Sequence, residues 1–166
     1  MWRIIILGPA DLERSIAESG LKQADLKVAV VRSRDEALLI LKGLDADALL
    51  VLGNVIGRDK ESLDLNKEVY PVAKKAGIAV LRVGGDETTP DEVLQLQRPL
   101  KFPAAAAEIT RCIRSFYATQ LGPDNELDAD GLRLALLRCE KLALTGVMHL
   151  TSGHLHGGIH FDNGGL

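Results

Sequence analysis

The chain has 166 residues, a length that suits one ordinary domain of about 100 to 150 residues with part of a second. Hydrophobic residues make up 46% and charged residues 26%, a balance that excludes wholesale disorder. The net charge of −3, with 20 Lys and Arg scattered along the sequence, gives no basic footprint for nucleic acid.

Short apolar runs alternate with amphipathic segments from residue 3 to about residue 120, which is typical of a parallel sheet with helices on both faces. The first run, Ile4 to Leu7, is too short for a signal peptide or a membrane span, so we expect a cytoplasmic protein. The predicted strands are 3–7, 27–31, 46–52, 78–83 and, with a poorer pattern, about 96–101.

Capping patterns mark the starts of two of the five predicted helices. Ser33 and Glu36 form a capping box, because each side chain can satisfy a backbone donor at the helix start. Thr89 and Glu92 repeat this pattern, with Pro90 at the first helical position. The other three helices are predicted between the first two strands, over about 61–75, and after residue 103.

A domain boundary is predicted after residue 120, where the composition changes. Gly122-Pro123 breaks the chain, and four acidic residues follow within residues 124–130. We therefore expect a domain over 1–120, an acidic linker over 121–130 and a second segment over 131–166. The second segment predicts a short helix followed by a β-hairpin over about 147–161.

The first 120 residues resemble the receiver domains of bacterial response regulators. The element count, the strand over 46–52 and the closing segment Leu100-Lys101-Phe102-Pro103 before the last helix carry this resemblance. It covers nearly the whole family domain. It implies a doubly wound, flavodoxin-like α/β fold, in which a five-stranded parallel sheet has the order 2-1-3-4-5.

The resemblance also implies a phosphorylation pocket, and in this chain that pocket is degenerate. Receivers hold magnesium with acidic residues at the end of the first strand, where this chain has Leu7, Gly8 and Pro9. The aspartate nucleophile belongs at the end of the third strand, but residues 51–56 contain no carboxylate. Asp59 follows beside two basic residues and fits a solvated turn better than a displaced phosphoryl acceptor.

The family's switch hydroxyl is missing as well, because residues 83–85 contain neither Ser nor Thr. Lys101 takes the place of the family's lysine, although the next proline comes two residues later and not directly. A lone lysine at a strand end is more often a surface residue. The degenerate pocket is expected to comprise Gly8, Pro9, Asp11, Gly53, Asn54, Gly84 and Lys101.

Loss of the magnesium ligands, nucleophile and hydroxyl together implies a pseudo-receiver that catalyses no reaction and needs no cofactor. The resemblance implies a protein partner on the surface of about residues 90–120, in bacterial signal transduction. The alternative is a regulatory domain that senses a small molecule in the vacated pocket, because open α/β sheets bind ligands at this edge. Gly53 and Gly84 could equally make tight strand exits.

The second segment resembles the start of the PATAN domain, found in bacterial regulators alongside receivers. The resemblance is carried by Leu134-Ala135-Leu136-Leu137, by 141–150 with Thr145-Gly146, and by 158–164 with Asp162-Asn163-Gly164. Asn163-Gly164 is typical of a two-residue hairpin turn, so we expect a further strand after it and a longer natural product.

All four histidines lie in this segment. With Ser152-Gly153 as the turn, His149 lies opposite His156, and such a pair could bind zinc, nickel or copper weakly. Adventitious or absent metal binding is the favoured interpretation, because the hairpin contains no cysteine. Cys112 and Cys139 each lie in an apolar helical pattern and are expected to be buried, unreactive thiols.

Overall fold

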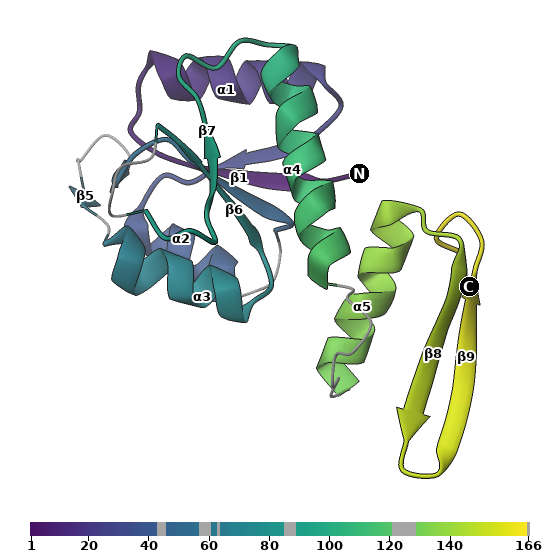
Figure 1. The fold of residues 1–166 in the computed structure, drawn as a ribbon. Helices are drawn as coiled ribbons and strands as arrows, with labels where there is room; N and C mark the ends of the chain where they lie inside the picture. The colour runs from purple at the N-terminus through teal and green to yellow at the C-terminus, as the bar shows by residue number, and fades with distance from the viewer. Residues whose placement is uncertain (43–45, 57–60, 63, 85–88, 121–128, 166) are drawn as a thin grey trace. The chain divides into compact units, whose positions relative to one another are not determined.

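The computed structural model of the chain describes residues 1–42, 46–56, 61–62, 64–84, 89–120 and 129–165 (Figure 1). Its contacts divide the chain into two compact units, called here unit 1 (Met1–Ile113) and unit 2 (Arg114–Leu166). Most of the predicted acidic linker lies outside the described residues, and its last two residues begin a helix.

Unit 1 is built on a five-stranded parallel sheet (Figure 1). The strand order is β2-β1-β3-β6-β7, which confirms the predicted order 2-1-3-4-5 and gives the receiver-like flavodoxin fold. Its strands are β1 (Arg3–Leu7), β2 (Lys27–Val30), β3 (Ala48–Val51), β6 (Ala79–Val83) and β7 (Leu94–Leu96). A small antiparallel pair, β4 (Val55–Ile56) with β5 (Glu61–Ser62), follows β3.

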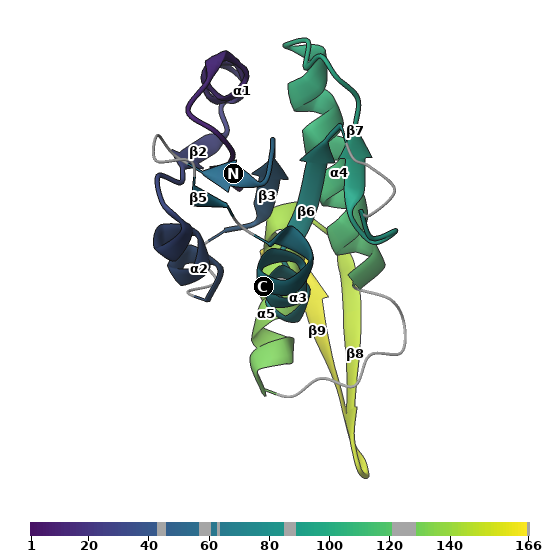
Figure 2. The same cartoon turned by 90° about the vertical axis from the view of Figure 1, so that its left-hand side faces the viewer.

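The central strands are buried on both faces because helices cover both sides of the sheet. All four residues of β3 are buried, whereas the edge strand β2 alternates between exposed and half-buried residues. Helices α2 and α3 pack with Ile5, Leu49 and Val51 in one cluster, and α1 and α4 lie over the opposite face (Figures 1 and 2). The helices of this unit are α1 (Leu12–Gln23), α2 (Arg34–Lys42), η1 (Leu65–Val69), α3 (Tyr70–Lys75) and the first part of α4 (Ala104–Gln120), whose residues from Arg114 onward belong to unit 2.

The capping box predicted before α2 is present in a slightly altered form. Ser33 Oγ accepts a hydrogen bond from the Glu36 amide at 3.3 Å. The Glu36 carboxylate accepts from the Arg32 amide at 2.7 Å, one residue before the predicted position. The start of the helix predicted from residue 61 lies later, because β5 occupies 61–62 and helical structure begins at Leu65 with Asp64 as its cap.

The helix predicted from Thr89, Pro90 and Glu92 was wrong. Residues 89–93 form a turn, in which the Val93 amide donates to the Pro90 carbonyl at 3.0 Å. Thr89 is buried, and its hydroxyl accepts from Arg82 at 3.0 Å, so its oxygen serves a tertiary contact and not a helix cap. The last strand accordingly begins early, at Leu94 and not near residue 96.

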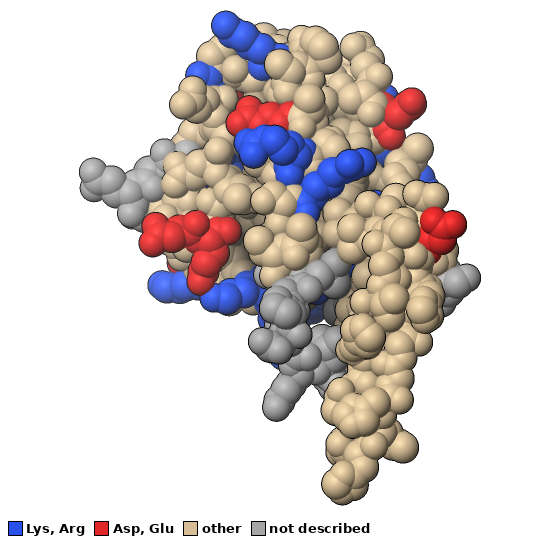
Figure 3. Space-filling view, turned by 45° about the vertical axis from the view of Figure 1, so that its right-hand side comes forward, with Lys and Arg blue, Asp and Glu red and all other residues tan. Residues whose placement is uncertain are grey.

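Unit 2 contains the helix α5 (Ala129–Leu142) and the hairpin of β8 (Gly146–Ser152) and β9 (Leu155–Phe161). Tyr117, near the end of α4, lies under the guanidinium of Arg138 from α5, 5.4 Å from the ring centre. The base of the hairpin is tied to its flanks, because Gly164 donates to the Leu144 carbonyl at 2.8 Å. Figure 3 shows the hairpin as an arm without charged colours.

The turn of this hairpin is Gly153-His154, which corrects the predicted turn at Ser152-Gly153. Ser152 pairs with Leu155, and Gly153 has a φ of 58°. A type II′ turn takes glycine at its first central position, so the turn begins at Gly153. His149 therefore pairs with Gly158, and His156 pairs with Thr151. The shift changes every partner by two residues, so the predicted faces are kept.

Candidate functional site

Glycine and proline line the edge of the unit 1 sheet where the strands end. Gly8 and Pro9 follow β1, Gly53 follows β3, and Gly84 follows β6. A Cβ at Gly8 would lie 2.8 Å from the Cβ of Leu52, so only glycine fits there without movement. A Cβ at Gly53 would lie at an ordinary 3.5 Å from Pro9 Cδ. The edge is thus closely packed around Leu52.

Leu52 takes the place at the end of β3 where the resemblance puts a nucleophile. Its side chain is buried at 3% exposure, and its amide donates to the Leu7 carbonyl at 2.8 Å. An apolar branched side chain can neither accept a phosphoryl group nor bind a cation. This position therefore serves packing between the ends of β1 and β3.

Arg98 crosses this edge from the segment after β7. Its Nη2 donates to the Leu52 carbonyl at 2.7 Å and lies 3.0 Å from Glu13 Oε2 of α1. Its stem packs against Gly84, where a Cβ would meet Arg98 Cδ at 3.2 Å. Arg98 thus connects the ends of β3 and β6 with helix α1, while its side chain stays half exposed.

Arg98 was not among the residues predicted from the sequence. Its partner Leu52 is 46 positions away, so no local pattern reveals the contact. One signal was available: Arg98 is directly followed by Pro99, as the family's lysine is by proline. Lys101, the predicted residue, is exposed beyond β7 near the start of α4.

The other predicted pocket residues do not converge on Arg98. Asp11 caps α1, where its Oδ1 accepts from the Arg14 amide at 3.0 Å, and Asn54 is exposed. Asp59 lies outside the described residues. Asp47 is buried, but it lies at the amino end of β3, where its Oδ2 accepts from the Arg3 amide at 2.7 Å. Glu13 is an acidic residue that does lie near the strand ends, and its carboxylate forms an ion pair with Arg98.

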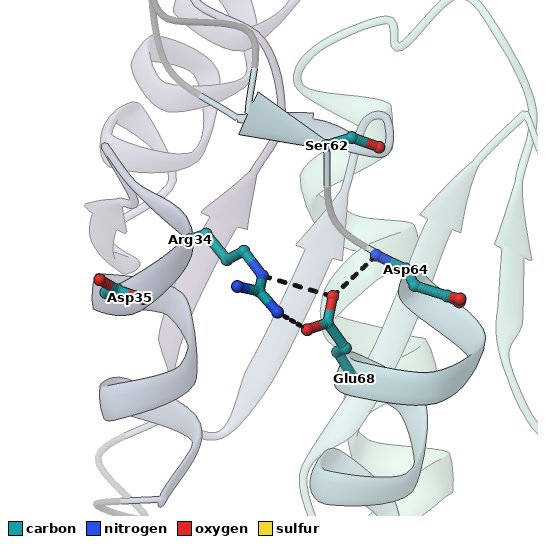
Figure 4. Close-up of a pocket in the computed structure, with 5 residues that line it drawn as sticks. All are labelled: Arg34, Asp35, Ser62, Asp64 and Glu68. Carbon is teal, nitrogen blue, oxygen red and sulfur yellow. Dashed lines mark hydrogen bonds and ion pairs between the residues drawn. The ribbon is translucent and has the colours of Figure 1, made fainter.

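A shallow polar pocket of about 530 Å³ lies between the amino ends of α2 and η1 (Figure 4). Glu68 forms an ion pair with Arg34 and accepts from the Asp64 amide at 3.0 Å. Asp64 Oδ1 caps η1 through the Lys67 amide, and Asp35 points away from the pair. These carboxylates are occupied by internal contacts that join two helix starts.

The two histidines predicted to lie opposite each other, His149 and His156, are not paired across the hairpin. His149, His156 and His160 share one face, because their pairing positions alternate with those of the apolar residues. His156 Nδ1 lies 3.3 Å from Thr151 Oγ1. The described residues contain no group of three or more His, Cys, Asp or Glu side chains that could hold a metal ion.

Both cysteines are free and buried, as predicted. Burial raises the pKa of the Cys112 thiol, partly offset by the charge of Arg111, and burial raises the pKa of the Cys139 thiol. A raised pKa keeps both thiols protonated at neutral pH, so neither is an activated nucleophile. Among the described helices, none is both long and apolar enough to span a membrane.

Comparison with known proteins supports the fold of unit 1. The chain is similar to SdrG from Sphingomonas melonis Fr1, with 18% identity and a TM-score of 0.53 over 68% of this chain and 96% of that one. It is similar to the N-terminal domain of a response regulator/sensory box/GGDEF protein from Carboxydothermus hydrogenoformans, with 11% identity and a TM-score of 0.56 over 70% and 98% of the two chains. The pseudo-receiver domain of CikA gives 16% identity and a TM-score of 0.52 over 70% and 97%.

No protein-family model matches the chain, and no curated protein matches it. At these identities the solved structures establish a shared fold and not a shared activity. The resemblance of residues 131–166 to a PATAN domain stays a prediction from the sequence.

Proposed function

We propose that unit 1 is a pseudo-receiver that acts in signal transduction through protein contacts, without phosphorylation and without enzymatic activity. This proposal rests on which residues lie at the edge of the sheet where the strands end. A buried leucine fills the place of the nucleophile, and Arg98 lies over it with its charge paired to Glu13. The fold shared with the CikA pseudo-receiver domain adds support.

The interaction surface proposed for unit 1 comprises the 89–93 turn, β7 and the first part of α4. Receivers of the family present a helix before the fifth strand, and this chain has a turn at 89–93 instead. Asp91, Glu92, Ala107, Glu108 and Arg111 are exposed there, whereas Ala105 and Ala106 are buried against the sheet. Mixed charges around small side chains fit a polar, reversible protein contact.

Phosphorylation chemistry is tested by mixing the purified chain with acetyl phosphate and Mg²⁺ and measuring its intact mass, with an active receiver domain as positive control. We expect no phosphoryl adduct, because a buried leucine follows β3, Glu13 is paired with Arg98, and Asp11 caps α1. An adduct on any aspartate overturns the proposal. A rise in melting temperature with a small metabolite would instead favour the sensing alternative.

The surface is tested with a photo-cross-linking residue placed at Ala107 on α4, in cells that produce the chain. Leu39 on α2 is the matched control, because it is also exposed, at 71%, but lies outside the proposed surface. We expect one discrete covalent protein adduct from position 107 and none from position 39. The same adduct from both positions, or none from 107, contradicts the proposed surface.

A further inference from the structure

The hairpin of unit 2 differs from the rest of the chain in charge. Residues 146–161 contain no Lys, Arg, Asp, Glu or Pro, although charged residues make up 26% of the whole chain. Figure 3 shows this arm without blue or red atoms. Natural edge strands usually carry lysine, proline or a bulge, because these features prevent pairing with another chain. The hairpin pairs in register through all seven positions of each strand and has none of these protections.

Each strand of this hairpin has an edge that no other strand of the described chain covers, because β8 and β9 form a sheet of two. A two-stranded sheet is at best marginally stable in water without a further strand or a helix on its apolar face. β8 is the better template, with Val147, Met148, Leu150 and Thr151 favouring strand structure. β9 has Gly157-Gly158 at its centre, which weakens a strand.

The two faces of the hairpin have different chemistry. Met148, Leu150 and Ile159 lie on one face and remain half buried, with Leu155 76% exposed at its end. The other face bears His149, His156 and His160. An added strand must continue both faces, so it needs the same alternation of apolar and polar residues.

We propose that β8 binds β8 of a second copy of this chain, in antiparallel orientation, to form a four-stranded sheet. This inference goes beyond the function proposed for unit 1 and does not depend on it. A second copy supplies the required alternation. The uncharged arm is also where two chains of net charge −3 can meet without like charges facing each other.

The length of β8 fixes the register. Full overlap of Gly146–Ser152 with its copy places His149 opposite His149 across the twofold axis. Met148 then lies opposite Leu150 of the second copy, so the apolar faces of the two hairpins become continuous. Val147 lies opposite Thr151 of the second copy on the histidine face.

Sedimentation velocity of the full chain over a concentration series tests this proposal. We expect a reversible dimer. His149→Glu puts two carboxylates directly opposite each other and should weaken dimerisation by at least about tenfold. His154→Glu is the matched control, because it makes the same change at the turn, off the strand edge, and should leave dimerisation unchanged.

A cysteine placed at residue 149 tests the register. His149→Cys should form a disulfide-linked dimer on mild oxidation, whereas Met148→Cys should not, because its partner would be a leucine. The native cysteines are buried and do not interfere. A wild-type chain that stays monomeric overturns the proposal. The free edge of β8 would then be a candidate for pairing with a strand of another protein. A dimer that His149→Glu leaves intact, or that Met148→Cys links as readily as His149→Cys, also overturns it.

Discussion

The strand ends of unit 1 and the hairpin of unit 2 use glycine for opposite reasons. Gly8, after β1, lies where a Cβ would meet the Cβ of Leu52 at 2.8 Å, and Gly20, in helix α1 of the same unit, lies where a Cβ would meet the Phe102 ring at 2.3 Å. In the hairpin, a Cβ at Gly153 or Gly157 would meet nothing within 4 Å. Glycine in unit 1 therefore permits close packing, whereas Gly153 permits a turn and Gly157 leaves the face open. We therefore expect a glycine-to-alanine substitution to change stability differently in the densely packed unit 1 and in the open hairpin.

The largest expected effect is that of Gly8→Ala, which should destabilise unit 1 by about 1–3 kcal/mol because Leu52 must move. Gly53→Ala is the control at the same edge and should stay within about 0.5 kcal/mol. Urea unfolding followed by the fluorescence of Trp2 measures both, because this single tryptophan is buried in unit 1. Equal losses from the two variants would show that the edge is not packed around Leu52.

Removal of the Arg98 guanidinium should have the next largest effect. Arg98→Ala removes the hydrogen bond to the Leu52 carbonyl and the ion pair with Glu13. We expect a loss of about 1 kcal/mol in the same assay, kept small by the solvent exposure of the side chain. Lys101→Ala, a change at an exposed lysine nearby, should leave unfolding unchanged. A larger loss from Lys101→Ala than from Arg98→Ala would show that Arg98 does not hold this edge together.

A smaller effect of opposite sign is expected in the hairpin. Gly157→Ala should stabilise β9 by roughly 0.4–1 kcal/mol, because alanine restricts the unfolded chain and its Cβ meets open space. Gly158→Ala is the control. Its added Cβ would lie 3.2 Å from Val147 Cγ1, so this variant should gain less stability. Amide hydrogen exchange of β8 and β9 measures the difference, and slower exchange in Gly158→Ala than in Gly157→Ala would contradict it.

The smallest effect concerns alkaline pH. The pKa values of Cys112 and Cys139 are raised from 9.0 by burial, so the folded state holds these protons longer than the unfolded state. This contribution to stability is complete below about pH 9 and is lost as the pH rises through the folded pKa values. Unfolding midpoints measured between neutral pH and pH 10 should therefore fall less in a Cys112→Ala, Cys139→Ala variant than in the wild type.

The sequence predicts the sheet order and most elements of unit 1 because these depend on local patterns. Periodicity marked the strands, and Ser33 with Glu36 marked the start of α2. The helix predicted at Thr89 failed because Arg82 engages the threonine hydroxyl, a contact between residues on two separate segments. The role of Arg98 could not be predicted for the same reason, because its partner Leu52 lies 46 positions away in the sequence. The correct hairpin register could have been predicted from the local sequence, since a type II′ turn takes glycine at its first central position and Gly153 occupies it.

The Arg98 bridge has a consequence for engineering. Leu52→Asp alone would place a carboxylate beside a guanidinium that already lies at this edge. Because Glu13 Oε2 lies 3.0 Å from the same guanidinium, the new carboxylate would have to compete with Glu13 for Arg98. A single substitution at Leu52 is therefore expected to change the ion pairing at this edge, and a design that introduces receiver chemistry would also have to change Arg98 and Glu13.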